Sequence, residues 1–237
     1  HLSLRRQRQM CIRDRPTIED VVDIQLDNPE GCARYAGRVI RNLDLTVSTP
    51  GWMQECLRRS GLRSLGPAVD VTNYVLLEMG QPMHAFDLSS ISGGVTVRMG
   101  KEELLSLLDD SEVTVDRNTL VISDNEKVLA LAGIMGGSES SVSSSTTDIF
   151  FESAWFNPLA LAGRARYFGK HTDSSHRFER GVDSDLQVSA IERATALILK
   201  ICGGSAGPVV VEESPSHLPK PVEITVSYTH LTLPTKA

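Results

Sequence analysis

The chain has 237 residues, of which 41% are hydrophobic and 23% are charged, as in ordinary soluble globular domains. Its length allows one large domain or two small domains with a substantial core. It contains no run of eighteen apolar residues and no charged leader followed by an apolar stretch, so we expect neither a membrane span nor a secretory signal.

The two ends differ in composition from the middle of the chain. Residues 1–15 are rich in arginine and have no apolar period, and residues 226–237 interrupt a plausible strand. We interpret both segments as non-native read-through and exclude them from the fold, as one excludes a tag. Residues 16–225 carry 18 basic and 29 acidic side chains, a net charge of −11. A body this acidic is not a general polyanion-binding surface, so any nucleic acid is expected to touch only one tip of it or to be held by another part of the molecule.

The four cysteines predict neither a metal site nor a disulfide framework. Cys11, Cys32, Cys56 and Cys202 form no CxxC pair, and no cysteine or histidine lies beside them at the spacing of zinc ligands. We therefore expect reduced thiols, no bound metal and a cytoplasmic location.

The first elements of the chain are predicted to be a strand and two helices. Residues 33–47 favour a strand because β-branched residues recur with partial alternation. Thr49 is predicted to cap a short helix that ends before Gly61. Asp70 is predicted to cap a second helix that Gly80 closes.

The centre of the chain is rich in short strands. Between residues 93 and 153 they recur roughly every ten residues, separated by Gly, Asp, Asn or Ser, which is typical of a small barrel or sandwich. The predicted strands are VTVRM, EVTVD, TLVIS, KVLALAG and DIFFES. Residues 138–147 are low in apolar content and are predicted to form a surface loop.

Helices dominate the rest of the chain. Asn157 is predicted to start a helix that Gly169 ends. Asp183 is predicted to cap the longest helix, residues 184–202, whose apolar side chains recur at three- and four-residue steps. The stretch PVVVEE returns to strand. The predicted fold class is α+β, with a strand-rich barrel- or sandwich-like core and flanking helices.

Four stretches carry more polar and glycine residues than packing alone requires. They are DVTNYVLLEMGQPMHAFD (70–87), LALAGIMGGSES (129–140), FFESAWFNP (150–158) and KHTDSSHRFERGVD (170–183). Ser175 and His176 suggest a nucleophile and its base, but adjacent side chains rarely point at each other and no Gly-x-Ser-x-Gly turn surrounds the serine. For Arg177, Glu179 and Arg180 we favour an ion-pair cluster that stabilises a turn.

Three further residues in these stretches stand out, and two of them, Gly136 and Glu152, leave two interpretations open. Gly136, beside a second glycine, fits either a tight turn or a close backbone approach to a bound molecule. His84 has no partner at ligand spacing and is typical of a hydrogen-bonded structural histidine. Glu152 lies among aromatic residues and needs a partner, because an unpaired buried charge is costly. An ion pair and a polar ligand group both satisfy that need.

Taken together, these stretches resemble the β chain of bacterial-type phenylalanyl-tRNA synthetases. The segments that match its central region, in order and with the expected spacing, are VDVTNYVLLEMGQPMHAFD, LAGIMGG, ESAWFNP, HTDSSHRFERGVD and ERATALILKICGG. The match runs from about Asn28 to Pro219. The resemblance implies that residues 16–225 form the third and fourth domains of that chain, an editing module of two interleaved subdomains.

The resemblance also implies a pocket that hydrolyses tyrosine wrongly attached to phenylalanine tRNA. The family's pocket positions fall here on Arg63, Asn73, His84, Gly136, Glu152, Thr172 and Ser174. Glu152 is the candidate acceptor for the tyrosine hydroxyl, in the form of an ionised carboxylate. Gly136 is expected to leave room for the ligand at close backbone distance.

The remaining pocket positions receive less specific roles. Thr172 and Ser174 are expected to line the wall, and Ser174 departs from the alanine that is common in the family. Arg63 and His84 are expected near the RNA 3′ end and the attacking water. No general base is named, because an aminoacyl ester is already activated and positioning a water molecule can suffice.

The resemblance implies partners and cofactors for the parent enzyme and none for this region. The partners are phenylalanine tRNA with a mischarged 3′ end and the synthetase α chain, in an α2β2 heterotetramer with no membrane contact. ATP and Mg²⁺ are expected to serve aminoacylation on the α chain. One alternative is a structural α–β assembly module with a decayed pocket. Another, a free-standing nucleic-acid-binding module, is disfavoured by the acidic body and by a lack of interleaved arginine and aromatic residues.

Overall fold

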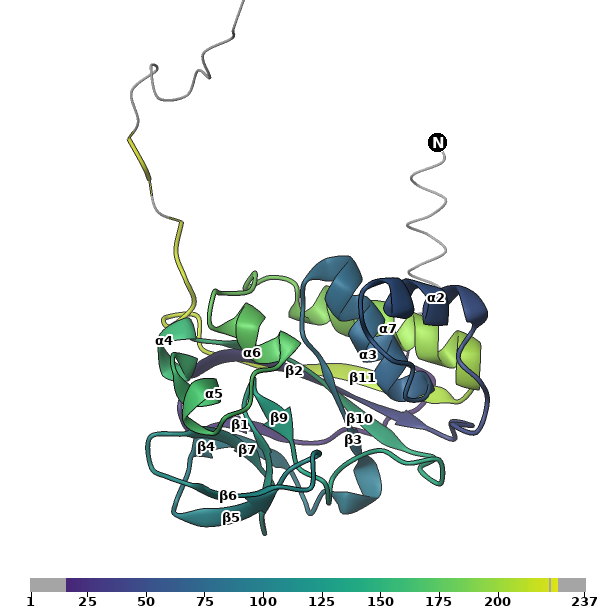
Figure 1. Ribbon diagram of the computed structural model, residues 1–237, viewed down its shortest axis with the longest axis horizontal. Coiled ribbons are helices and arrows are strands. Elements are labelled where there is room, and N and C mark those ends of the chain that lie inside the picture. The colour runs from purple at the N-terminus through teal and green to yellow at the C-terminus, as the bar shows by residue number, and fades with distance from the viewer. Residues whose placement is uncertain (1–15, 222, 226–237) are drawn as a thin grey trace, which may run out of the picture.

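The computed structural model describes residues 16–221 and 223–225 (Figure 1). The interpretation of residues 1–15 and 226–237 as non-native read-through concerns segments outside the described residues. The described part of the chain consists of two main sheets, a two-stranded ribbon and helices on two sides.

The first sheet has four antiparallel strands in the order β11-β2-β10-β3. Their bounds are Cys32–Arg41 (β2), His84–Asp87 (β3), Ile149–Phe156 (β10) and Ser205–Glu213 (β11). Every residue of β10 is buried, which explains its nearly continuous apolar sequence, IFFESAWF. Glu152 is the one ionisable residue in this strand.

The second sheet has five strands in the order β1-β4-β7-β8-β9, with β1 and β4 parallel and the other neighbours antiparallel. Its strands are Ile24–Leu26 (β1), Val95–Met99 (β4), Leu120–Ser123 (β7), Val128–Leu131 (β8) and Met135–Gly136 (β9). The separate ribbon pairs Glu103–Ser106 (β5) with Glu112–Val115 (β6). No sheet within the described ranges closes into a barrel, so the α+β sandwich-like core is confirmed and its barrel-like variant is not observed.

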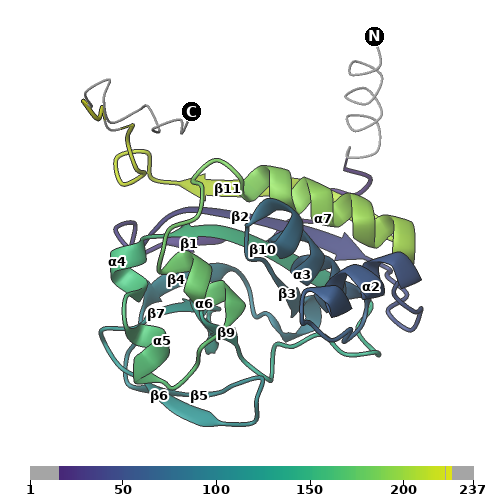
Figure 2. The ribbon, with the colours of Figure 1, turned by 45° about the horizontal axis from the view of Figure 1, so that its top comes forward.

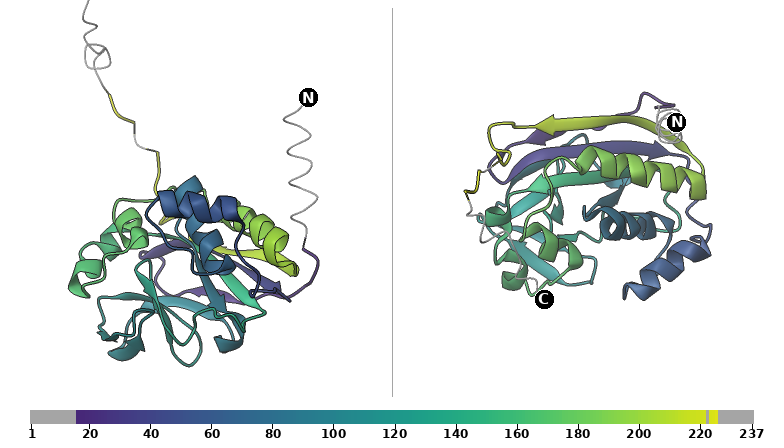
Figure 3. Two further views of the ribbon diagram at one scale, coloured as in Figure 1. Left: turned by 45° about the vertical axis from the view of Figure 1, so that its right-hand side comes forward. Right: turned by 90° about the horizontal axis from the view of Figure 1, so that it is seen from above.

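Two groups of helices flank the sheets (Figures 1 and 2). The first group is Gly51–Arg59 (α2), Pro67–Met79 (α3) and Gln187–Cys202 (α7), and the second is Pro158–Leu161 (α4), Arg164–Tyr167 (α5) and Asp173–Phe178 (α6). A 3-10 turn, Leu88–Ser90 (η1), follows β3. Figure 3 shows the two groups apart from each other in both of its views.

Successive side chains of β10 point to opposite faces of the sheet and therefore contribute to two separate hydrophobic cores. Ile149 and Phe151 pack with α3 and α7 in one hydrophobic cluster. Phe150 points to the opposite face and packs in a second cluster with strands β4 and β7 of the five-stranded sheet. The described chain therefore has three layers, helices on sheet on sheet. The prediction that residues 16–225 form two interleaved subdomains stays a prediction.

The predicted caps of α2 and α3 are wrong, because tertiary hydrogen bonds use the same side chains. Pro50 is the N-cap of α2, and the Thr49 hydroxyl donates to the Asp70 carboxylate at 2.5 Å. Helix α3 begins three residues before Asp70. The fully buried Asp70 also accepts from the Ser64 hydroxyl at 2.5 Å and the Leu65 amide at 2.8 Å, so it holds the loop between the two helices.

Other element boundaries also differ from those predicted. Gly163 has φ 75°, and this left-handed turn divides the helix predicted after Asn157 into α4 and α5. Asp183 does not cap α7, since its carboxylate accepts from the Asp185 amide. The strand predicted over 33–47 ends at Arg41. Gly80 does close α3, with φ 78°.

Gly37 provides a stability test of the sheet. A Cβ at this position of β2 would lie 2.2 Å from Cζ and 2.6 Å from Cε2 of Phe150. Because Gly37 pairs with strands on both sides, the backbone cannot move away, and we expect Gly37→Ala to lower the free energy of unfolding by about 1–3 kcal/mol. Urea denaturation measures the change.

The matched control for that substitution is Gly51→Ala. No atom lies within 4 Å of a Cβ built at Gly51, which begins α2, and alanine is the better helix former. We expect this variant to unfold at the parent urea concentration or slightly above it. Equal midpoints for the two variants would contradict the proposed clash with Phe150.

Candidate functional site

Two adjoining cavities lie where β3, β9, β10, α3 and α6 meet. The small cavity has a volume of about 60 Å³ and the large cavity about 400 Å³. The residues that line both are Met83, His84, Ile134, Met135, Gly136 and Ser174. Glu152 lines the small cavity only, whereas Asn73 and Thr172 line the large one. The shared walls make the two cavities parts of one cleft.

Glu152 lies at the centre of the four-stranded sheet. It pairs in register with His84 of β3 on one side and with Gly37 of β2 on the other. Directly paired residues point to the same face of a sheet, so the Glu152 and His84 side chains share the face turned toward the second sheet. Glu152 is only 6% exposed, and no described residue forms a hydrogen bond or ion pair with its carboxyl group.

Burial changes the expected charge of this carboxyl group. With no cation beside it, desolvation raises the pKa of Glu152 to about 8. The group is therefore mostly protonated at neutral pH, whereas the sequence led us to expect an ionised carboxylate. A protonated carboxyl can donate one hydrogen bond and still accept others. The ion-pair interpretation of Glu152 is thus wrong, while its interpretation as a polar ligand group stays a prediction.

His84 is half-buried and uncharged. Desolvation lowers the pKa of its imidazole to about 4. Its ring packs edge-on against Phe86, with centroids 4.5 Å apart, and its Nε2 atom is buried without a hydrogen-bond partner among the described residues. A structural histidine would be expected to have that partner, so His84 leaves a polar atom available at the cleft.

Gly136 lies close against the His84 ring. A Cβ at Gly136 would be 2.5 Å from Cε1 and 2.7 Å from Nε2 of His84. Gly133, three residues earlier, has φ 67° and supplies the turn between β8 and β9. The turn in this glycine-rich stretch is therefore made by Gly133, whereas a close approach of Gly136 to a bound molecule stays a prediction.

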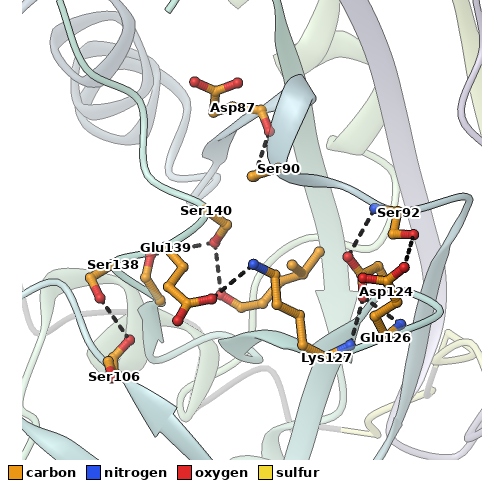
Figure 4. A network of polar contacts seen from close by, with 12 residues as sticks. Asp87, Ser90, Ser92, Ser106, Asp124, Glu126, Lys127, Ser138, Glu139 and Ser140 are labelled. Atoms are coloured by element: carbon orange, nitrogen blue, oxygen red, sulfur yellow. Dashed lines mark hydrogen bonds and ion pairs between the residues drawn. The ribbon is translucent and has the colours of Figure 1, made fainter.

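The loop that follows β9 is held by side-chain hydrogen bonds (Figure 4). The Ser138 hydroxyl donates to the Ser106 carbonyl of β5 at 3.3 Å, and the Ser140 hydroxyl donates to the Leu129 carbonyl of β8 at 3.1 Å. Because these bonds tie the loop to two strands, they fix the position of Gly136 at the edge of the sheet.

Thr172 connects α6 to the opposite wall of the cleft. Its hydroxyl accepts from the Ser175 amide at 3.0 Å as the N-cap of α6 and donates to the Ile134 carbonyl at 2.9 Å. Ser175 is buried and its hydroxyl bonds to Thr172, whereas His176 is exposed. Ser175 and His176 therefore do not form a catalytic pair.

The structure brings six of the seven predicted pocket residues together and leaves one outside. Arg63 lies exposed in the loop between α2 and α3 and lines neither cavity. Met83, Ile134 and Met135 line both cavities and were not predicted, although they flank His84 and Gly136 in the same motifs. Asp109, also unpredicted, comes from the β5–β6 turn, which no motif marks.

The described residues include free thiols but no cluster of metal-ligating side chains. Among residues 16–221 and 223–225, no group of three or more His, Cys, Asp or Glu side chains could hold a metal ion. Cys32, Cys56 and Cys202 are free thiols. None of the helices in this part of the chain is long and apolar enough to cross a membrane.

Comparison with known proteins identifies the family. The model of the B3/4 domain matches residues 31–203. The chain belongs to the B3/4 domain family. A phenylalanine–tRNA ligase β subunit from Vibrio parahaemolyticus is 56% identical to this B3/4 domain chain over 217 residues, which cover 91% of this chain and 27% of the relative. One from Hahella chejuensis is 59% identical over 203 residues, covering 85% and 26%. The resemblance to the phenylalanyl-tRNA synthetase β chain is thus confirmed.

The B3/4 domain chain spans about a quarter of the length of these curated relatives. Among solved structures, an N-terminal fragment of the phenylalanyl-tRNA synthetase β-subunit from Pyrococcus horikoshii is similar, with a TM-score of 0.48 and 14% identity over 80% of this chain and 51% of that one. The family assignment rests on the B3/4 match and not on this structure.

Proposed function

We propose that this B3/4 domain is an editing module that hydrolyses tyrosine wrongly esterified to phenylalanine tRNA. The observation that carries the proposal is the buried, unpartnered Glu152 carboxyl in a cleft that His84 and Gly136 also line. The names of the relatives, phenylalanine–tRNA ligase β subunits, agree with such a substrate.

The chemistry of the two amino acids explains why a polar group is needed in the cleft. Tyrosine differs from phenylalanine by one hydroxyl group, and an apolar synthetic site rejects an added hydroxyl by only ~10²-fold. A second site can select for the hydroxyl by offering it a buried partner. The protonated Glu152 carboxyl can both accept from a phenol and donate to it. Phenylalanine would leave this group unpaired, at a cost of about 1–3 kcal/mol.

The size and lining of the cleft suit an amino-acid ester. The large cavity, at about 400 Å³, falls in the range of small-molecule sites. Asn73, Thr172 and Ser174 supply polar side chains to its lining, while the unpartnered Nε2 of His84 is available to hold a water molecule. An activated ester needs a positioned water more than a nucleophile. Arg63, outside both cavities, is proposed to contact the RNA.

A deacylation assay tests this proposal. We expect the parent chain to hydrolyse the tyrosyl ester of phenylalanine tRNA faster than the phenylalanyl ester of the same tRNA. Glu152→Ala should lower the ratio of the two kcat/KM values by about 5- to 150-fold, the equivalent of the lost hydrogen bond. The control is Glu139→Ala, because Glu139 is an exposed glutamate that pairs with Lys127 at the surface.

The results separate the proposed function from its alternative. An unchanged ratio in Glu152→Ala would contradict the role of Glu152. No hydrolysis of either ester by the parent chain would favour the structural α–β assembly module with a decayed pocket.

We extend the proposal to the parent protein, of which this chain covers only a part. The partners are then phenylalanine tRNA with a mischarged 3′ end and the synthetase α chain in an α2β2 assembly. ATP and Mg²⁺ serve aminoacylation in that assembly, with no cofactor bound by this region, and the location is cytoplasmic. The relatives' name, a ligase that joins phenylalanine to tRNA, supports this extension.

A further inference from the structure

The charge of the molecule is reversed in one segment. Residues 163–180, the basic segment, hold five basic side chains and two acidic ones. The rest of residues 16–225 holds 13 basic and 27 acidic side chains. The basic segment spans α5 and α6 and carries a net positive charge, in contrast to the acidic remainder.

Two of the five cationic side chains in the basic segment form no ion pair with a described carboxylate. Arg164, Lys170 and Arg177 are each paired with an aspartate. Arg166 and Arg180 are exposed, and no described carboxylate pairs with either of them. Arg180 donates only to the His176 carbonyl at 3.0 Å. Exposed guanidinium groups without carboxylate partners are suited to bind phosphate.

An exposed aromatic ring follows Arg166 directly in the sequence. Tyr167 is 63% exposed, its ring packs edge-on against Phe168 at 4.9 Å, and the Arg164 guanidinium lies 4.7 Å from its centroid. Contacts on two sides hold the ring while leaving much of it in solvent. Sites for single-stranded nucleic acid combine such a ring with nearby cations. The stretch RARYF (164–168) thus interleaves arginine and aromatic residues, contrary to the expectation from the sequence.

The basic segment continues into the cleft. Thr172 and Ser174 belong to this segment and also line the large cavity. Lys170 is paired with Asp109, another residue of the cavity wall. Figures 1 and 2 both show α6 beside β9, with α5 next to α6. A strand bound along α5 and α6 would therefore end at the opening of the cavity.

We propose that the basic segment binds the single-stranded 3′ end of the RNA whose ester enters the cleft. Arg166 and Arg180 bind its phosphates, and Tyr167 stacks on one of its bases. The acidic remainder of the domain repels RNA, so the strand is directed onto this one surface. The inference rests on the proposed function for its substrate, and it adds the surface that holds the nucleic acid.

Fluorescence anisotropy with a labelled single-stranded RNA ending in CCA tests the inference on the full chain. We expect Arg166→Glu/Arg180→Glu to weaken binding at low salt by about tenfold or more and to reduce the slope of log affinity against log salt by about 1.4, or 0.7 per lost phosphate contact. Tyr167→Ala should weaken binding about tenfold through lost stacking. The arginines of residues 1–15 are common to all variants and cancel from each comparison.

The control is Lys200→Glu, the same charge reversal at an exposed residue of α7, where we expect a change of less than about threefold. The single variants Arg166→Glu and Arg180→Glu change the charge by the same amount as this control. If each of them lost no more RNA affinity than Lys200→Glu, the inference would be overturned. The inference would also be overturned if variants of the basic segment kept their affinity for RNA but lost affinity for an acidic polypeptide. That result would indicate a protein partner. The labelled RNA carries no ester, so its affinity is measured whether or not the chain hydrolyses the tyrosyl ester, and failure of the proposed esterase activity is distinguishable from failure of this surface.

Discussion

Gly136→Ala is expected to lower hydrolysis of the tyrosyl ester by about a hundredfold or more while the domain stays folded. The added Cβ would lie 2.5 Å from Cε1 and 2.7 Å from Nε2 of His84, and 3.3 Å from Leu108. His84 must then move away from the cleft or the ligand must lose its place beside Gly136. A displacement of about 1 Å at a reacting centre costs on the order of 10²-fold in rate.

Two measurements make this expectation specific. Values of kcat/KM for the tyrosyl ester report the site, and thermal unfolding followed by circular dichroism reports the fold. Gly51→Ala, which adds the same methyl group in open space, should keep the parent activity. Parent-like hydrolysis by a folded Gly136→Ala would mean that the ester does not approach this glycine.

Glu152→Gln is expected to stabilise the domain at alkaline pH and to lose that advantage in acid. The pKa of Glu152 is about 8 in the folded chain, whereas a glutamate in an unfolded chain has a pKa near 4.5. Between these values the folded state binds more protons than the unfolded state, so stability falls as pH rises from about 4.5 to about 8. Glutamine has no proton to lose, and the pH-dependent difference should reach about 3–5 kcal/mol above pH 8.

Urea denaturation at pH 4.5 and pH 8.5 measures this difference. His84, whose pKa burial lowers to about 4, is present in both proteins, so its titration largely cancels. Glu139→Gln is the control, since Glu139 is an exposed residue whose replacement should shift stability by less than about 0.5 kcal/mol at either pH. Parallel stability curves for Glu152→Gln and the parent would show that Glu152 is already ionised in the folded chain.

Elements with a strong local signal were predicted well. Strand β10, the periodic apolar face of α7 and the left-handed Gly80 after α3 all depend on short-range preferences that the residues carry wherever they are. Thr49 and Asp70 show where such reasoning fails. Both are good caps by type, yet they bond to each other across 21 residues, a partnership that no local pattern contains.

For the candidate site, too, local patterns predicted some features and tertiary contacts decided the others. Motifs marked His84, Gly136 and Glu152 as unusual, and they do meet, because pairing of β3 with β10 places His84 directly opposite Glu152. Arg63 lies outside these motifs and was included only through the family resemblance, and the structure leaves it in an exposed loop. Residue type and spacing indicate that a side chain is special, but only the register of distant strands determines which special side chains share a cavity.

The sequence by itself determined the family, the α+β class and six of the residues that line the cleft, because each is written in residue types and local periods. Only the tertiary structure decided the charge of Glu152. Its carboxyl becomes a neutral group because the two sheets exclude water and bring no cation near it, and desolvation depends on neighbours from β3, β8, β9 and α6 rather than on the strand that carries it.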